Sequence, residues 1–174
     1  LMKALKNETE IKRTRNAMAK DGAALARTFY WLEQSLKNET VVTEADFADK
    51  LAEHRSQMPD YRGESFPAII GYRENGAIIH YRPMHGSCAR IKPEGLLLAD
   101  SGCQYLDGTT DITRTITLGT PTKEEIRNFT LVLKGNIALS RATFPKGTTG
   151  AQLDILARKF LWDHGLNYGH GTGH

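Results

Sequence analysis

The amino-acid sequence predicts an α+β fold. Apolar residues recur at helical intervals in two stretches near each end of the chain, whereas residues 66–118 show short apolar runs separated by turns. No long alternation of strands and helices is present, which disfavours a doubly wound parallel sheet. With 174 residues, of which 40% are apolar, the chain is long enough for one domain with a hydrophobic core.

Two helices are predicted in the first 60 residues. Asn7 precedes Glu10 at the spacing of a capping box, so the first helix should begin there. Its apolar positions recur at helical intervals and are Ile11, Met18, Leu25, Phe29 and Leu32. The second helix should begin at Thr43 and end before Pro59. Its inward residues should be Phe47, Leu51 and Met58.

Two further helices are predicted after residue 120. Thr122 should cap a helix that extends to about Arg141. Its inward residues should be Ile126, Phe129, Leu133 and Ile137. A fourth helix should extend from about Ala151 to His164, and Gly165 is a suitable residue to terminate it.

Strands are predicted between these helix pairs. Residues 68–72 and 77–81 are apolar runs on either side of Asn75-Gly76, which indicates a turn. Asp100 closes the apolar run 95–100, and Asp111 opens a second β-type run that continues to Leu118. The residues between these aspartates, which include Gly102 and Asp107-Gly108, should form an irregular hairpin loop.

Such a hairpin would bring the carboxylates of Asp100 and Asp111 together. Two ionised carboxylates repel one another, so a close pair needs a proton or a cation between them. Oxygen ligands combined with imidazole suit Mn²⁺, Zn²⁺, Co²⁺ or Fe²⁺. Taken alone, the pair fits a structural interpretation better, in which Asp100 caps a turn and Asp111 lies on the surface.

Three histidines are candidates for the same site. His170 and His174 belong to a Gly-rich segment, and in an extended chain they would lie roughly 13 Å apart. One would then bind a metal while the other contacts substrate; the alternative is a disordered tail. His80 follows three apolar residues and should lie on or beside a strand, where a satisfied core or edge histidine is the alternative. No role is assigned to His54, His85 and His164.

Composition excludes several other classes of protein. The net charge of +3 is mild, and no basic stripe with interleaved aromatic residues indicates a nucleic-acid partner. No apolar run approaches 18 residues, so no membrane span is expected. Cys88 and Cys103 form no disulfide framework, and no signal-peptide core is visible, which favours the cytoplasm.

A nucleophilic hydrolase is also disfavoured. The sequence contains no Gly-x-Ser-x-Gly motif, and Ser101 should lie in a turn without an evident base. Nothing near Cys103 indicates a lowered pKa for its thiol.

The motifs at residues 100–105, 107–115 and 170–174 together resemble aminopeptidase P, the Xaa-Pro aminopeptidase branch of the methionine aminopeptidase, prolidase and creatinase superfamily, in its long three-domain form. Residues 75–81 and 131–135 also resemble that family. The resemblance implies a partial pita-bread fold, with a mixed or antiparallel curved sheet and helices packed on one face.

The resemblance also implies roles for individual residues. Asp100 and Asp111 match metal ligands, with Asp111 bridging two divalent ions, and His174 matches the histidine ligand. His80 and His170 match catalytic histidines that contact substrate. Mn²⁺ is the favoured ion, with Zn²⁺ or Co²⁺ as alternatives. Separately from the resemblance, Thr113 and Thr115 alternate with apolar or basic residues along their predicted strand, and we expect them to help to order the carboxylates.

The implied reaction is hydrolysis of the bond between an amino-terminal residue and a following proline, in a peptide substrate. A prolidase that cleaves only Xaa-Pro dipeptides and a non-enzymatic pita-bread binding module are the alternatives. A homodimer is compatible with the family, whereas neither a nucleic acid nor a membrane is expected as a partner.

Residues 1–174 resemble an incomplete catalytic domain. By this resemblance, residues 1–174 are expected to match neither the family's amino-terminal domains nor its two glutamate ligands, which would lie beyond the residue that matches His174. We therefore expect that a chain of this length holds metal ions weakly or partially and turns over little substrate.

Overall fold

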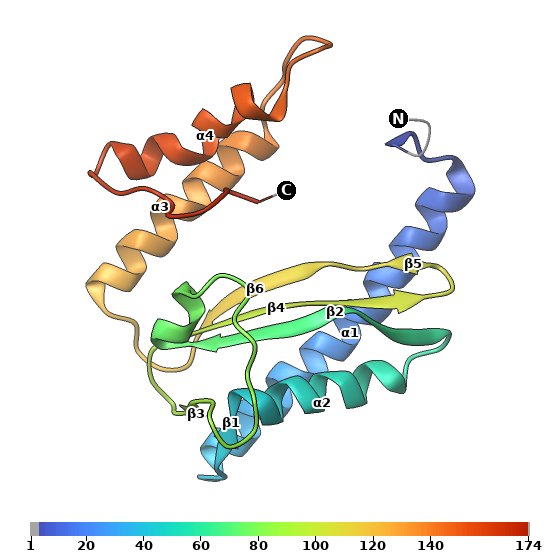
Figure 1. Cartoon of the computed structure of the whole chain (residues 1–174), viewed down its shortest axis with the longest axis vertical. Helices are drawn as coiled ribbons and strands as arrows, with labels where there is room; N and C mark the ends of the chain where they lie inside the picture. Colours follow the sequence, from blue (N-terminus) through green and yellow to red (C-terminus); the bar gives the residue numbers. More distant parts are fainter. Residues whose placement is uncertain (1–3, 174) are drawn as a thin grey trace. The chain divides into compact units, whose positions relative to one another are not determined.

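The computed structural model describes residues 4–173 and divides the chain into two compact units, one ending at Thr120 and the other beginning at Pro121 (Figure 1). The sequence predicted a single domain with one core, so this division was not anticipated.

The first unit begins with the two predicted helices, α1 (Glu8–Lys37) and α2 (Glu44–Ser56). Asn7 and Thr43 cap them, and each forms a complete capping box with the acidic residue three positions later. Both predicted starts are confirmed. A side-chain oxygen satisfies a backbone amide that the first helical turn leaves unpaired, so this signal is local in sequence.

The sheet of the first unit contains β2 (Tyr61–Tyr72), β4 (Leu96–Tyr105), β5 (Gly108–Thr109) and β6 (Ile112–Thr117). The strand β4 pairs with each of the other three, always antiparallel. A separate two-stranded sheet joins β1 (Val42–Thr43) to β3 (Arg90–Ile91). The short 3-10 helix η2 (Arg73–Ala77) follows β2 directly.

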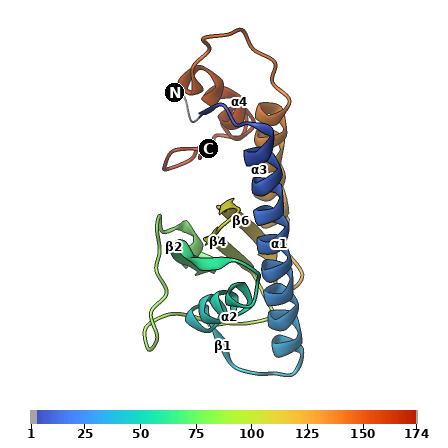
Figure 2. The ribbon, with the colours of Figure 1, turned by 90° about the vertical axis from the view of Figure 1, so that its right-hand side faces the viewer.

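The two helices cover one face of this sheet, and α1 extends along its length (Figure 2). The hydrophobic core lies between these layers. It consists of Leu25, Leu32, Val42, Phe47, Leu51, Ala68, Ile70, Tyr72, Ile91, Leu97, Ala99 and Ile112. Phe47 and Leu51 of α2 are fully buried, as predicted.

The second unit contains α3 (Lys123–Ser140) and α4 (Gly150–Trp162). Thr122 caps α3 through a capping box, as predicted. The helices pack closely at Gly135, where a Cβ atom would lie 2.2 Å from the carbonyl oxygen of Ala157. After α4, Gly165 has φ +69°, and the amides of Gly165 and Leu166 donate to Trp162 and Leu161, which is the predicted glycine termination.

The prediction of which side of α3 faces inward is wrong. The four residues predicted to face inward are 45–53% exposed: Ile126, Phe129, Leu133 and Ile137. The buried positions are instead Leu131 and Gly135, on a different side of the helix. The helical period was correct, but the side that contacts α4 depends on the small residue Gly135, which carries no hydropathy signal.

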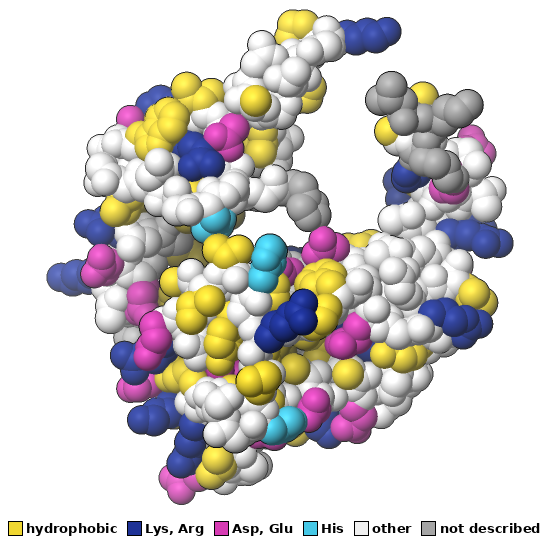
Figure 3. Space-filling view, in the orientation of Figure 1, with side chains coloured by type: hydrophobic (Ala, Val, Ile, Leu, Met, Phe, Trp, Pro, Cys, Tyr) yellow, Lys and Arg dark blue, Asp and Glu magenta, His cyan; other side chains and the backbone are white. Residues whose placement is uncertain are grey.

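The surface is chemically mixed. On the face drawn in Figure 3, basic and acidic side chains are interspersed among neutral ones, in keeping with the mild net charge. None of the helices in residues 4–173 has both the length and the apolar character to cross a membrane.

Candidate metal centre

Asp100 and Asp111 lie on the hairpin formed by β4 and β6. Asp100 is opposite Thr113 in the register, and Asp111 directly precedes Ile112, the first residue of β6. The prediction that Asp100 ends its strand is wrong, because β4 continues to Tyr105 and pairs there with β2. Ser101, predicted in a turn, is therefore a buried strand residue.

Gly102 explains this error. In the sequence it indicates a turn, but in the structure it lies within β4. A Cβ atom at this position would lie 2.2 Å from both the Ser65 hydroxyl and the Thr110 carbonyl oxygen. Glycine is thus required because neighbouring chain segments approach closely. A glycine within a strand can mark such a close approach instead of a turn.

The register places both carboxylates on one face of the hairpin. Ser101 and Ile112, which are paired, are buried on the side of α1 and α2, as is Thr110. Side chains alternate along a strand, so Asp100, Asp111 and Thr113 point to the other side. Asp100 is half-buried and Asp111 is exposed. The expected approach of the two acidic groups on one hairpin is consistent with this register.

Thr113 orders one of the carboxylates. Its hydroxyl donates to Oδ1 of Asp100 over 2.7 Å. This bond agrees with the expectation for Thr113 at Asp100, whereas the parts expected of Thr113 at Asp111 and of Thr115 stay predictions. A carboxylate oxygen has two lone pairs, so this hydrogen bond leaves Asp100 able to bind a cation.

A buried ion pair lies on the opposite side of the same hairpin. Nε and Nη2 of Arg55 donate to Oδ1 and Oδ2 of Asp21 over 2.6 and 3.0 Å, and both side chains are fully buried. Sequence reasoning missed this pair. Asp21 lies four residues after Ala17, and Arg55 four residues after Leu51, so each charged residue occupies an inward helical position. A charged residue at an inward helical position is the sequence pattern that could have predicted this buried ion pair.

His80 lies in the same unit but not on a strand. The chain leaves β2 through η2, and His80 follows in an exposed turn with φ +56°. The predicted strand at 77–81 is therefore wrong, and Asn75-Gly76 belongs to the 3-10 helix rather than a hairpin turn.

Glu44 explains why this segment does not extend the sheet. Its fully buried carboxylate accepts hydrogen bonds from the Tyr81 hydroxyl at 2.7 Å, the Asn75 amide group, and the backbone amides of Tyr72 and Ala89. Burial, followed by this contact with Glu44, raises the pKa of Tyr81 to about 12. Glu44 thus fixes the ends of the loop that carries His80.

Replacing Glu44 with glutamine should lower the free energy of unfolding by about 2–4 kcal/mol, because the amide group of glutamine would point donors at groups that already donate. Urea denaturation of the 174-residue chain measures this change. Glu53→Gln is the control, since Glu53 lies on the same helix but is exposed, with a surface contact to Lys50. Equal losses for both variants would contradict the role of Glu44.

His170 belongs to the second unit, in the segment that follows α4. Arg158 donates to the carbonyl oxygen of His170 at 3.3 Å, and the rings of His170 and Tyr168 lie 5.6 Å apart. Thr172 donates to Asp154 over 2.7 Å, and this bond and that from Arg158 lower the pKa of Asp154. The segment therefore makes specific contacts with α4 instead of forming the alternative, a tail without contacts.

His174, the predicted third metal ligand, lies outside the described residues. Among residues 4–173, no three His, Cys, Asp or Glu side chains are grouped so that they could hold a metal ion. What the described part supplies is a pair of carboxylates on one hairpin face, which are hard oxygen donors suited to divalent ions. These residues fit a metal ion as part of a ligand set, and the remaining ligands must come from elsewhere.

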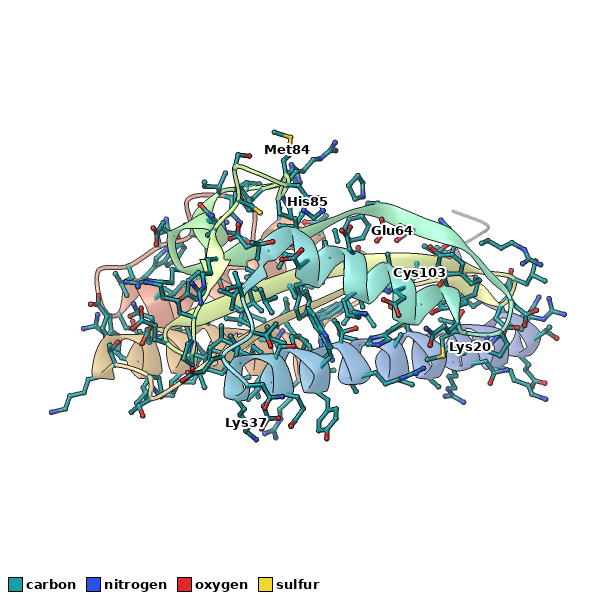
Figure 4. All side chains as sticks on the ribbon, turned by 90° about the horizontal axis from the view of Figure 1, so that it is seen from below. Lys20, Lys37, Glu64, Met84, His85 and Cys103 are labelled. Atoms are coloured by element: carbon teal, nitrogen blue, oxygen red, sulfur yellow. The ribbon has the colours of Figure 1, made fainter. Side chains whose placement is uncertain are left out.

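Cys103 is not a nucleophile in this structure. It is buried beside Ala17 and Tyr105, and burial raises the pKa of its thiol. Figure 4 labels Cys103 and Lys20 near the end of α1 that meets the β4–β5 hairpin. A raised pKa disfavours the reactive thiolate, in agreement with the sequence-based expectation. Both cysteines are free thiols.

The structure is an α+β fold whose β4–β6 hairpin carries two aspartates. A family model described as metallopeptidase family M24 matches residues 12–174. The chain therefore belongs to metallopeptidase family M24, and the predicted α+β fold and family resemblance are confirmed.

Named relatives agree over nearly the whole chain. Probable Xaa-Pro aminopeptidases P from Fusarium vanettenii and Sordaria macrospora are 56% and 53% identical over 173 residues, which is 99% of this chain and 28% of each relative. The crystal structure of an X-prolyl aminopeptidase from Caenorhabditis elegans, described as a cytosolic enzyme with a di-nuclear active site, is 43% identical with a TM-score of 0.93. The match covers 99% of this chain and 28% of the Caenorhabditis elegans chain. The chain thus spans a little over a quarter of these relatives.

Proposed function

We propose that the whole protein is a metal-dependent aminopeptidase that hydrolyses the bond between an amino-terminal residue and a following proline. The observation that carries this proposal is the β4–β6 hairpin, in which Asp100 is opposite Thr113 and Asp111 directly precedes Ile112, in a chain that is 53–56% identical to proteins of that name. Residues 1–174 are then part of its catalytic domain.

In this proposal Asp100, Asp111 and His174 would be ligands of two divalent ions. Bound ions would polarise the scissile carbonyl and acidify a water molecule. Carboxylate oxygens suit Mn²⁺ better than softer ligands would, and Zn²⁺ or Co²⁺ are the alternatives. Support for two ions comes from the di-nuclear site described for the Caenorhabditis elegans enzyme.

The two remaining histidines are proposed to contact substrate. His80 is exposed at a turn whose flanks are fixed by Glu44, so its imidazole is available to a ligand. His170 has its carbonyl oxygen held by Arg158, which fixes the backbone at the imidazole that would bind the peptide.

The expected partner is a peptide with proline at its second position, and the proposed location is the cytoplasm, as described for the Caenorhabditis elegans relative. A homodimer remains part of the proposal. Two free cysteines are compatible with a reducing compartment.

A peptide assay tests this function in the whole protein, expressed from its complete coding sequence and loaded with Mn²⁺. We expect release of alanine from Ala-Pro-Ala, with no release from Ala-Ala-Ala, and loss of activity after chelation of the metal. Preference for the dipeptide Ala-Pro would favour the prolidase alternative. Failure to cleave any of these peptides would favour the binding module. The same assay on the 174-residue chain tests the expectation that it turns over little substrate.

A further inference from the structure

The buried side of the β4–β6 hairpin contains a polar network that contacts the immediate neighbours of both acidic residues. Ser101 follows Asp100, and Thr110 precedes Asp111. Both neighbours are at most 1% exposed and face α1 and α2, whereas the two carboxylates face the other way. Any group that fixes Ser101 and Thr110 therefore also fixes the backbone that carries Asp100 and Asp111.

Arg55 and Asp21 are such groups. Nη2 of Arg55 donates to the Ser101 hydroxyl at 3.0 Å, and Nη1 donates to the carbonyl oxygen of Gly102 at 3.3 Å. Oδ2 of Asp21 accepts from the Thr110 hydroxyl at 2.6 Å. The ion pair between them joins these contacts, so one rigid charged unit connects the segment after Asp100 to the segment before Asp111.

Thr110 closes this arrangement within the hairpin itself. Its hydroxyl accepts from the backbone amide of Cys103 at 3.0 Å, and its own amide donates to the Cys103 carbonyl at 2.9 Å. Its carbonyl oxygen accepts from the Ser65 hydroxyl of β2 at 3.0 Å. The side chain therefore has a donor and an acceptor role that valine, with the same shape, cannot reproduce.

We propose that Asp21 and Arg55, acting through Thr110 and Ser101, are positioning residues that set the spacing of the Asp100 and Asp111 carboxylates. The relevance of this spacing to catalysis rests on the proposed metal-dependent function. A guanidinium gives planar, directional hydrogen bonds, so it holds two partners in one geometry better than a flexible ammonium. Partners that orient metal ligands commonly change metal affinity tenfold or more when they are removed.

The test compares Thr110→Val with Thr28→Val. Thr28 is also fully buried, and its hydroxyl bonds to the Ala24 carbonyl oxygen and to His54, which belong to α1 and α2. The matched pair separates loss of a buried hydroxyl from loss of positioning. Two quantities are measured: the dissociation constant for Mn²⁺ in the whole protein, and the proton–proton Overhauser effects between Asp100 and Thr113 in the metal-free 174-residue chain.

We expect Thr110→Val to raise the dissociation constant for Mn²⁺ roughly tenfold to a hundredfold and to weaken the Asp100–Thr113 effects. Thr28→Val should leave both unchanged, and Thr110→Ser, which keeps the hydroxyl, should restore both. If Thr110→Val does not fold, Ser101→Ala removes one acceptor of Arg55 and should give a smaller shift in the same direction.

Unchanged metal affinity and unchanged Overhauser effects in Thr110→Val would overturn the proposal. If the unsubstituted whole protein binds no Mn²⁺, the proposed metal-dependent function is wrong. The Overhauser effects then decide the positioning role alone: weakening in Thr110→Val but not in Thr28→Val supports it, and equal spectra refute it.

Discussion

Replacing Arg55 with methionine is expected to lower the free energy of unfolding of the 174-residue chain by about 3–5 kcal/mol. Methionine is similar in length but carries no charge, so the carboxylate of Asp21 would remain fully buried without its counter-ion. Ser101 and Gly102 would also lose their donor. Urea denaturation, monitored by far-ultraviolet circular dichroism, measures the change.

Two controls accompany this prediction. Arg27→Met makes the same substitution on the exposed side of α1, where Arg27 donates a hydrogen bond to Gln57, and should cost no more than about 0.5 kcal/mol. The double variant Asp21→Leu, Arg55→Met removes the unpaired carboxylate as well and should recover part of the loss. A loss for Arg55→Met no larger than that for Arg27→Met would contradict the account.

The second large effect concerns metal affinity. Asp111→Asn in the whole protein should raise the dissociation constant for Mn²⁺ at least ~100-fold, because a neutral amide replaces a charged ligand that is proposed to bridge both ions. Isothermal titration calorimetry of the metal-free protein measures this constant.

Asp107→Asn is the matched control for this substitution. Asp107 lies four residues before Asp111 in the same hairpin, where it forms an ion pair with Lys20 at 2.7 Å. Asp107 is not a proposed metal ligand. The dissociation constant of its variant for Mn²⁺ should therefore lie within about twofold of that of the unsubstituted protein. Similar losses in the two variants would indicate a general effect of hairpin charge instead of ligation.

Features encoded by neighbouring residues could be predicted from the sequence. The starts of α1, α2 and α3 follow from Asn7, Thr43 and Thr122, each with an acidic residue three positions later. The glycine termination at Gly165 is equally local. Such signals involve one helical turn, and no distant contact competes with them.

Features that depend on distant segments could not be predicted. Asp100 lies within a long strand because β2 pairs with residues on both sides of it, such as Ala99 with Ile70 and Gly102 with Phe66, and these partners are distant in the sequence. The segment with His80 leaves the sheet because Glu44, on α2, binds both of its ends. Apolar runs indicate a strand or a turn locally but do not reveal these partners.

The candidate site was predicted in part for the same reason. Asp100 and Asp111 could be singled out because one closes an apolar run and the other opens the next, and both lie on the β4–β6 hairpin or directly before its second strand. The buried ion pair behind this hairpin, Asp21 and Arg55, joins residues 34 positions apart and was missed because charged residues are usually assumed to be solvated. The catalytic roles of His80 and His170 and the metal-ligand roles of Asp100, Asp111 and His174 remain predictions.

An anomalous-scattering map from crystals of the whole protein grown with Mn²⁺ tests most directly whether Asp100 and Asp111 bind metal together. We expect manganese peaks within about 2.5 Å of carboxylate oxygens of both Asp100 and Asp111, with the Thr113 hydroxyl still bonded to Asp100. Manganese bound elsewhere, with these two carboxylates pointing to opposite faces of the hairpin, would contradict it.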